Sequence, residues 1–447
     1  MNHTPAPPTP IPFFLRGRLR EVPSVRIAYA VLLAARVIGG YKLIGLRHRL
    51  GLVRNREAAV RRHHTAGAWR VYRGAVQLQG LMVKIGQSIG ANPAAVPLEY
   101  ITVLARLQDA VPPRPWREMQ PQIERALGCP VDQAFAAFDR RPVAAASLAQ
   151  VYRARLHDGR DVAVKVLYPG IERLVRSDLR VLKFLLWLDS RFGGYPLEPV
   201  YDELATNVPL EVDLAHEARV MGEMALALAD EPRVFIPAVV PELSSRRLLV
   251  MDWVDGIKIT ESARLRAAGI DVQSVADLLS DLYARMVLAD GFFHADPHPG
   301  NLFALSGDRL AIVDFGLTKR LAPAFRRSLA QFTRAMFTLD TPAMMDAFDA
   351  LGFRVRDGDD TAVFLATGEF FRRITDPATY QSGPGSMNSL NNEWARAVKA
   401  NPFVAIPGDL ALVSRVFSLL TGVGVGMGAE PRVLAAVLKY TGDRAMA

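Results

Sequence analysis

The stretch FFHADPHPGNLF, Phe292–Phe303, decides how the chain is interpreted. It sets Asp296 five residues ahead of Asn301, with a proline on each side of His298 and a glycine before the asparagine. Thirteen residues after Asn301, the apolar run RLAIVDFG ends in the tripeptide Asp314–Gly316. Prolines restrict the backbone, so we expect this loop to hold its polar side chains with little reorganisation.

The order and spacing of Asp296, Asn301 and Asp314 match the protein-kinase signature. In that signature the loop aspartate positions the attacking hydroxyl, and the other two side chains hold Mg²⁺, a hard ion that prefers oxygen ligands. Upstream, VAVK at Val162–Lys165 places a lysine on a predicted strand, from which kinases contact the α and β phosphates. The sequence therefore predicts a phosphoryl-transfer site that uses ATP and Mg²⁺.

The glutamate that would pair with Lys165 is expected on a following helix. EVDLAHEA supplies Glu211, Asp213 and Glu217 there, and we expect Glu217 to be the partner. The alternative is that the three carboxylates form one solvated helix face.

Two histidines flank the catalytic loop, His294 and His298. Their spacing of four could suggest transition-metal ligands, but no third ligand lies nearby and the prolines oppose helical geometry. We expect ordinary hydrogen-bonding roles for both.

The alternating segments SLAQVYRARL and DGRDVAVKVLY predict a β-hairpin with Asp158-Gly159 as its turn. This hairpin departs from protein kinases ahead of Lys165. Where kinases carry G-x-G-x-x-G-x-V, this chain reads AAASLAQV. The residues expected to face the nucleotide are Ala144, Ala145, Ala146 and Ser147. Each added Cβ limits the approach of backbone to phosphate, so we expect nucleotide to bind through Lys165 and Mg²⁺ in a pose that does not favour protein phosphorylation.

A second departure precedes the hairpin: LMVKIGQSIGANP, Leu81–Pro93, carries Lys84, Gly86 and Gln87 on a predicted helix. With this KxGQ motif, the chain resembles the UbiB/AarF family of atypical kinases of the ubiquinone-biosynthesis type. The family motifs LQDAVPP, the alanine-rich loop, VAVK, ExD, HADPHPGN and DFG follow in family order over about residues 75–320.

The resemblance implies that the KxGQ helices cover the active site, with Lys84 and Gln87 near Glu211 and Asp213. It also implies ATPase-like or small-molecule-directed chemistry, and association with membranes and isoprenoid lipids. The chain departs from the family at Ala149, where many members keep glycine. It departs again at Asn92, where an arginine before the proline is usual.

Charge is concentrated at the start of the chain. The net charge is +9, but Met1–Arg73 alone holds 14 Lys and Arg against two acidic residues, a balance of +12. The apolar run Ile27–Ala35 lies between arginines and is too short to span a bilayer, which favours an interfacial helix on an anionic membrane surface over a spanning one. Ordinary core packing of the run, with the basic residues on a solvated surface, is the alternative. No nucleic-acid recognition module is apparent. A single cysteine, Cys129, and no signal-peptide pattern suggest a cytoplasmic, peripheral membrane protein.

The predicted fold class is α+β, a two-lobed protein-kinase-like fold with an N-terminal helical KxGQ extension and a mostly helical C-lobe. The predicted parts are a disordered leader at 1–12, a basic helical extension at 13–130, an N-lobe at 131–255 and a C-lobe at 256–447. Helical patterns are expected at Ile171–Leu188 and around Glu203–Leu228, and Phe403–Gly426 reads as a buried helix.

Three functions remain open from the sequence. The first is an Mg-ATP-dependent ATPase or kinase that is peripheral to the membrane and supports isoprenoid-quinone or related lipid metabolism, with lipid-biosynthesis enzymes as partners. The second is a small-molecule phosphotransferase of the aminoglycoside-kinase type, although such enzymes lack KxGQ. The third is a nucleotide-gated lipid-binding or scaffold protein in which hydrolysis is incidental.

Overall fold

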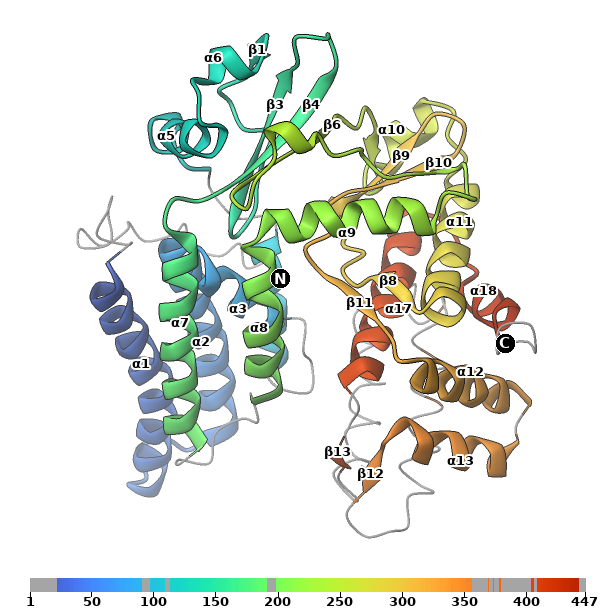
Figure 1. The fold of residues 1–447 in the computed structure, drawn as a ribbon. Helices are drawn as coiled ribbons and strands as arrows, with labels where there is room; N and C mark the ends of the chain where they lie inside the picture. The colour runs from blue at the N-terminus through green and yellow to red at the C-terminus, as the bar shows by residue number, and fades with distance from the viewer. Residues whose placement is uncertain are drawn as a thin grey trace. The chain divides into compact units, whose positions relative to one another are not determined.

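The computed structural model describes residues 22–90, 97–108, 113–190, 198–338, 340–355, 403–405 and 408–441, with isolated positions at 369, 373 and 378. The predicted leader, Asn92 and most of LQDAVPP lie outside these residues. The chain forms two compact units (Figure 1). The first comprises Met1–His216 and Val240–Met251, and the second comprises Glu217–Val239 and Asp252–Ala447.

The first compact unit begins with helices. They are α1 Pro23–Arg49, α2 Arg56–Leu78, α3 Leu81–Gly90, α4 Leu98–Leu104, the 3-10 helix Ala105–Gln108, α5 Trp116–Leu127 and α6 Val131–Ala134. A buried core joins α2, α3, α4 and the 3-10 helix through Ala68, Ala75, Val83, Tyr100, Val103, Leu104 and Leu107. The KxGQ helix α3 is therefore part of a packed helical layer.

Helix α1 is tied to this layer by a buried arginine. Arg26 is 2% exposed; its Nε lies 2.9 Å from Asp178 Oδ1, and its Nη1 donates to Leu78 O at 2.6 Å. Arg26, one of the two arginines that bound the apolar run Ile27–Ala35, is therefore buried. A buried guanidinium needs such acceptors, and they fix the start of α1 against helix α7, Ile171–Ser190, and the end of α2.

A small sheet follows in the first compact unit, in the strand order β1-β3-β4-β6 with β2 beside β3. The strands are β1 Ala137–Phe138, β2 Ala144–Ala145, β3 Ala149–Arg155, β4 Asp161–Leu167 and β6 Leu248–Asp252. The predicted hairpin is confirmed as β3 and β4, and Gly159 in its turn has φ +91°.

Three helices follow the hairpin: α7 Ile171–Ser190, α8 Glu198–Glu211 and α9 Leu214–Ala227. The expectation that Glu211, Asp213 and Glu217 share one helix is wrong, because α8 ends at Glu211 and α9 begins after Asp213. Asp213 Oδ1 accepts from Ala215 N and His216 N at 3.2 and 3.3 Å. It therefore caps α9, the role that aspartate favours at a helix start.

The second compact unit contains three small sheets, with strand orders β5-β10-β9-β7, β11-β8 and β12-β13. Their strands are β5 Val234–Phe235, β7 Ile257–Lys258, β8 Phe292–His294, β9 Leu302–Leu305, β10 Arg309–Ile312, β11 Thr318–Arg320, β12 Arg354–Val355 and β13 Phe403–Ala405. The loop between β8 and β9 is the HADPHPGN motif.

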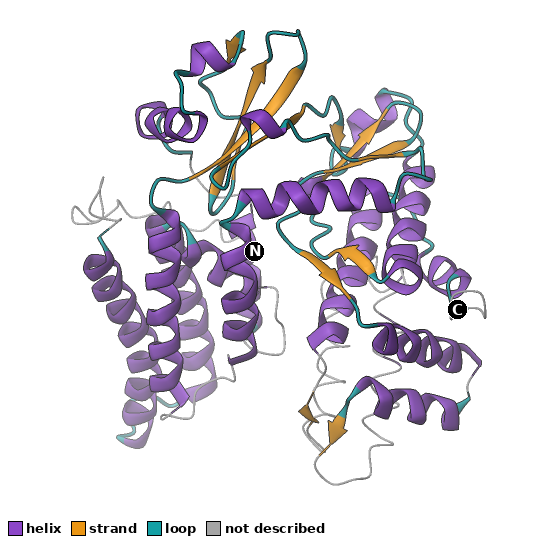
Figure 2. Cartoon of the chain, in the orientation of Figure 1, coloured by secondary structure: helices purple, strands orange, loops and turns teal. Residues whose placement is uncertain are grey.

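Helices make up most of the rest of this unit, as the purple segments of Figure 2 show. They are α10 Ser262–Ala267, α11 Val272–Ala284, the π-helical turn Arg285–Asp290, the 3-10 helix Pro299–Asn301, α12 Pro323–Thr338, α13 Thr341–Leu351, α17 Gly408–Met427 and α18 Val433–Lys439. The fold is helix-rich with small sheets.

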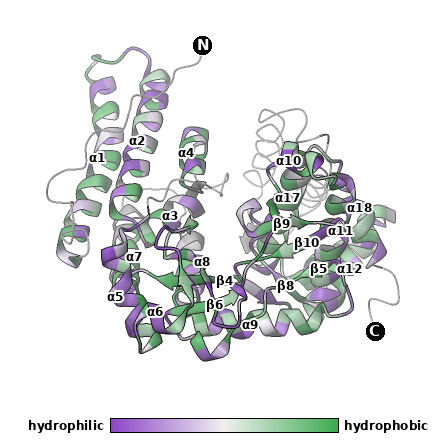
Figure 3. Cartoon of the chain, turned by 90° about the horizontal axis from the view of Figure 1, so that it is seen from above, coloured by the Kyte–Doolittle hydropathy of each residue, from purple (hydrophilic) through white to green (hydrophobic). Residues whose placement is uncertain are grey.

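Two helices, α1 and α17, are long and apolar enough to cross a membrane by length and composition. Half of the apolar window of α17 is buried, whereas 6% of the α1 window is buried. The core helix of a soluble protein passes the same test, so these properties alone assign no span. Helix α1 is longer than the apolar run Ile27–Ala35, and Figure 3 shows hydrophobic and hydrophilic residues interleaved along it.

Candidate active site

The HADPHPGN loop is closed by its own backbone and by two side chains. His298 N donates to Asp296 O at 2.6 Å, and Asn301 N donates to His298 O at 2.8 Å. His298 Nδ1 accepts from Gly300 N at 3.1 Å and caps the 3-10 helix. Asn301 Nδ2 donates to Asp296 O at 3.3 Å, so its amide is oriented with the nitrogen toward the loop. The Asn301 Oδ1 is the atom left for a cation.

Asp314 follows the end of β10 in a left-handed backbone conformation, with φ +64°. Val313 N donates to Asn301 O at 2.9 Å, which joins the segment of Asp314 to that of Asn301. Gly316 N contacts Asp314 Oδ1 at 3.4 Å. A non-glycine residue in this region is uncommon, and aspartate is among those that tolerate it. The structure thus brings Asn301 and Asp314 to one place in the second compact unit.

A buried histidine holds the Asp314 backbone. His294 is fully buried, with Nε2 at 2.8 Å from Asp314 O and Nδ1 at 2.8 Å from Tyr283 Oη. A carbonyl only accepts, so Nε2 carries the proton and Nδ1 accepts from the tyrosine. Burial lowers the pKa of His294, although the hydrogen bond to Asp314 and the charges of Asp296 and Asp314 oppose this shift. The ring is neutral and structural, as expected.

Metal ligation by the two histidines receives no support. Over the described ranges, no group of three or more His, Cys, Asp or Glu side chains could hold a metal ion.

Tyr283 is a partner of His294 that the sequence did not indicate. Burial raises the pKa of Tyr283 well above its usual value, and the negative charge of Asp296 adds to this rise.

Glu217 contacts the DFG segment. It is 1% exposed, and its Oε1 accepts from Phe315 N at 3.3 Å. Lys165 lies on β4 of the first compact unit, opposite Val151 of β3, and is 7% exposed. The Lys165–Glu217 ion pair stays a prediction.

Arg415 of α17 is a contact of the catalytic loop that the sequence did not indicate. Its Nη2 lies 3.7 Å from Asp296 Oδ1, and both side chains are about 30% exposed. Lys319 Nζ lies 2.7 Å from Asp409 Oδ1 at the start of the same helix. Arg415 lies more than a hundred residues after the HADPHPGN motif, and no local sequence pattern predicts its contact with Asp296.

The alanine-rich segment forms a tight turn between β2 and β3. Ala146 N donates to Ala149 O at 2.8 Å, and Tyr168 Oη donates to Ala146 O at 3.0 Å. The turn therefore consumes the Ala146 N–H that a phosphate-binding loop would offer. Ala144 and Ala145 pair with β3, and Ser147 lies within the turn.

The KxGQ residues divide between two contacts within the first compact unit. Lys84 Nζ lies 2.8 Å from Glu211 Oε1. Gln87 Nε2 instead donates to Leu107 O at 3.1 Å, and a Cβ on Gly86 would lie 2.3 Å from Leu107 Cδ1. The glycine is therefore required for close packing.

Gln87 and Asp213 have other contacts in this region, and their expected proximity stays a prediction. Gln87 contacts the 3-10 helix. Asp213 lies 3.0 Å from Arg246 Nη2 and caps α9.

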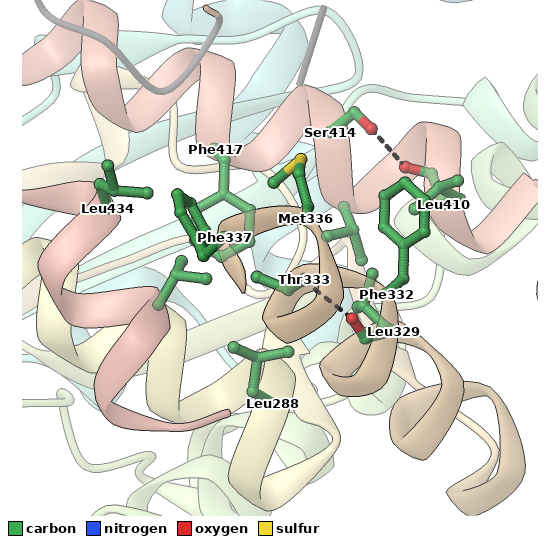
Figure 4. Close-up of a pocket in the computed structure, with 12 residues that line it drawn as sticks. Leu288, Leu329, Phe332, Thr333, Met336, Phe337, Leu410, Ser414, Phe417 and Leu434 are labelled. Atoms are coloured by element: carbon green, nitrogen blue, oxygen red, sulfur yellow. Dashed lines mark hydrogen bonds between the residues drawn. The ribbon is translucent and has the colours of Figure 1, made fainter. Parts of the chain in front are cut away.

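An apolar pocket lies in the second compact unit (Figure 4). Its walls come from the π-helical turn, α12, α17 and α18. Its two polar side chains donate within their own helices, Thr333 to Leu329 O at 2.8 Å and Ser414 to Leu410 O at 2.7 Å. The pocket encloses about 60 Å³, far below the roughly 300 Å³ of small-molecule sites. It could take a few methylene groups, but not an isoprenoid chain.

The comparisons with known proteins agree with this geometry. The model of the ABC1 atypical kinase-like domain matches residues 106–348. An uncharacterized protein of Synechocystis sp. is 34% identical over 362 residues, covering 78% of this chain and 88% of that protein. AarF domain-containing protein kinase 1 of Xenopus tropicalis is 29% identical over 438 residues, covering 93% of this chain and 82% of that one.

Other relatives are longer. Protein ACTIVITY OF BC1 COMPLEX KINASE 3, chloroplastic, of Arabidopsis thaliana is 32% identical over 366 residues, which cover 81% of this chain and 51% of that protein. The chain spans 55% and 63% of two further uncharacterized Synechocystis proteins. The complex of Rv3197 with erythromycin from Mycobacterium tuberculosis has a TM-score of 0.57 at 23% identity, covering 86% of this chain and 97% of that one, which shows the shared fold alone.

Proposed function

Because the chain belongs to the ABC1 atypical kinase-like family, we propose that it is an Mg-ATP-dependent ATPase or kinase. The identification made from the sequence is confirmed, since relatives carry the names AarF domain-containing kinase and ACTIVITY OF BC1 COMPLEX KINASE. The observation that carries the proposal is the junction of Asn301 and Asp314 through the Val313–Asn301 hydrogen bond.

The donor set at this junction suits Mg²⁺. Asn301 Oδ1 and the Asp314 carboxylate are hard oxygen ligands, and the hydrogen bonds of their neighbours orient both before any ion binds. When bound, the ion would neutralise the charge of the nucleotide phosphates. Two ligands are typical for an ion that keeps waters and shares substrate phosphates.

The other residues have distinct proposed tasks. Asp296 orients the attacking water or hydroxyl and accepts its proton, and Arg415 places positive charge beside that carboxylate. Lys165 neutralises the nucleotide phosphates, and Glu217 holds the DFG segment through Phe315 N. The Ala146 N–H is used within its own turn, so this segment has one N–H fewer for phosphate than a glycine-rich loop. We therefore favour water over a protein hydroxyl as the phosphoryl acceptor.

The two compact units correspond in this account to the two lobes of a kinase, with the KxGQ helices belonging to the first. Lys84 and Glu211 act as a gate, in which the ion pair holds α3 against the end of α8. The family membership extends this proposal to isoprenoid-quinone or related lipid metabolism. We propose no role with nucleic acid.

Peripheral membrane binding is proposed through the outward face of α1. Leu32, Leu43 and Leu46 of α1, and Leu50 directly after its end, are between 46% and 63% exposed. Arg47 and Arg49 of the same helix are also exposed, as suits an interface with anionic lipid. Leu43→Glu with Leu46→Glu should abolish co-sedimentation with anionic vesicles. Leu226→Glu, at a leucine that is 80% exposed on α9, is the control.

Nucleotide binding tests the core of the proposal. A fluorescent ATP analogue should bind the wild-type chain in the presence of Mg²⁺, and Asp314→Asn should weaken binding at least about tenfold, since it removes one charged ligand. Asparagine also tolerates positive φ, so the backbone is preserved.

Asp308→Asn is the matched control, because Asp308 also has positive φ, at +53°, and accepts from Asp271 N away from the site. Equal binding by wild type and Asp314→Asn would overturn the proposed metal site.

A further inference from the structure

A wide groove opens in the first compact unit. It has a volume of about 730 Å³, within the range of ligand sites. Its walls come from α5, α7, the joint between α8 and α9, and the turn before β6. The polar lining is Gln122, Arg125, Glu172, Arg176, Ser245, Arg246 and Arg247.

The groove is strongly basic, with four arginines against a single glutamate in its lining. Arg247 Nε lies 2.6 Å from Glu172 Oε1, which neutralises one of them. Arg125 Nε and Arg176 Nε donate only to carbonyls of their own helices, at 3.0 and 3.3 Å. Within the described ranges, neither Arg125 nor Arg176 has a carboxylate partner, so their charge faces the groove and solvent.

A buried amide adds a second, independent observation. Gln122 is 3% exposed and lines the groove, and its amide is not among the fully buried polar atoms that lack a partner, so the amide opens to the groove. An amide in this position can donate to a bound anion. A solvated arginine surface alone would not require a polar side chain at the buried floor.

We propose that this groove binds a phosphate-bearing anion, supplied either as soluble phosphate or as the headgroup of an anionic lipid. Arginine guanidinium groups bind phosphate oxygens through paired donors, and the Gln122 amide supplies a further neutral donor. Binding here does not depend on nucleotide or on the proposed ATPase.

The groove also touches the joint that carries the gate. Pro209 and Val212, which flank Glu211, lie in its lining. Arg246 lies in the lining as well and contacts Asp213, the cap of α9, at 3.0 Å. A bound anion would compete with Asp213 Oδ2 for Arg246, while Asp213 Oδ1 makes the cap of α9. Phosphate bound in the groove would therefore lie beside the joint between α8 and α9.

Phosphate binding to the full-length chain tests the assignment. Calorimetric titration with inorganic phosphate, in chelator to remove divalent cations, is paired with co-sedimentation on phosphatidylcholine vesicles with and without phosphatidic acid. The groove variant is Arg125→Gln with Arg176→Gln, and Gln122→Leu removes the amide without changing charge. The matched control is Arg173→Gln with Arg180→Gln, which removes the same charge from exposed positions of α7 outside the lining.

The expected result is at least about tenfold weaker binding by the groove variant, weaker binding by Gln122→Leu, and little change in the control. If the groove variant binds inorganic phosphate more weakly than the wild type, soluble phosphate is the source. If only its binding to phosphatidic acid vesicles is weaker, the lipid headgroup is the source. The assignment is overturned if wild type binds neither probe, or if control and groove variants weaken equally, because the attraction is then diffuse charge.

Discussion

Replacing Asp178 by asparagine is expected to release α1 from the first compact unit. Arg26 is 2% exposed and Asp178 is 1% exposed. Two of the guanidinium nitrogens contact the two carboxylate oxygens, and Arg26 also donates to the carbonyls of Leu78 and Gln79. Burial raises the pKa of Asp178, and the hydrogen bonds and charge of Arg26 oppose that shift.

The magnitude follows from leaving a buried cation without its counter-charge. Breaking such a pair on one side costs about 3–5 kcal/mol, and asparagine keeps one acceptor, so we expect about 3 kcal/mol. This corresponds to an increase of roughly a hundredfold in the opening constant of α1. Arg26→Met with Asp178→Leu should recover most of the loss, because no buried charge then lacks a partner.

Hydrogen–deuterium exchange on peptides of α1 measures this opening directly. Amide exchange in α1 should accelerate about a hundredfold in Asp178→Asn, relative to wild type. Asp161→Asn is the control, because its ion pairs with Arg153 and Arg155 are exposed to solvent and should leave α1 unchanged. Unchanged exchange in α1 of Asp178→Asn would show that the pair does not hold the helix.

Two further predictions concern single residues. Gly86→Ala should lower the free energy of unfolding in urea by about 1–3 kcal/mol, because the new Cβ would lie 2.3 Å from Leu107 Cδ1. Gly39→Ala is the control and should be neutral or stabilising, because a Cβ at Gly39 would have nothing within 4 Å. His294 has a pKa lowered by burial, so the unfolded chain takes up the proton first and stability should fall as pH drops below about 6.5. His294→Gln should show a shallower fall in the urea midpoint between about pH 7.5 and about pH 5.5, measured in chelator, and an unchanged slope would contradict the neutral buried ring.

The hairpin and the catalytic loop were predictable from the sequence because their signals are local. Alternating apolar residues around Lys165 specify a strand, and Asp158-Gly159 marks its turn. The order of Asp296, Asn301 and Asp314 specifies a phosphoryl-transfer loop without any knowledge of the fold.

The break between α8 and α9 had a local signal that was not used. Pro209 lies within the last turn of α8, and Asp213 stands where an N-cap is favoured, directly before Leu214. Periodicity alone merged the two helices, because apolar spacing continues across the cap.

Contacts between distant segments had no signal at all. Arg26 reads as one more basic residue beside an apolar run, yet its partner lies on α7. Arg415 lies within an apolar helix, yet it contacts Asp296. Such pairs depend on tertiary packing, which brings together residues that no spacing rule connects.

Asn301, Asp314 and Asp296 are proposed to form a site that hydrolyses ATP with Mg²⁺. The most direct measurement is phosphate release by the purified chain, with and without anionic vesicles, in parallel with Asp314→Asn and Asp308→Asn. We expect vesicle-stimulated release that is retained in Asp308→Asn and lost in Asp314→Asn. Equal inactivity of all three chains, while the wild type still binds Mg-ATP, would contradict the claim and favour a nucleotide-gated binding protein.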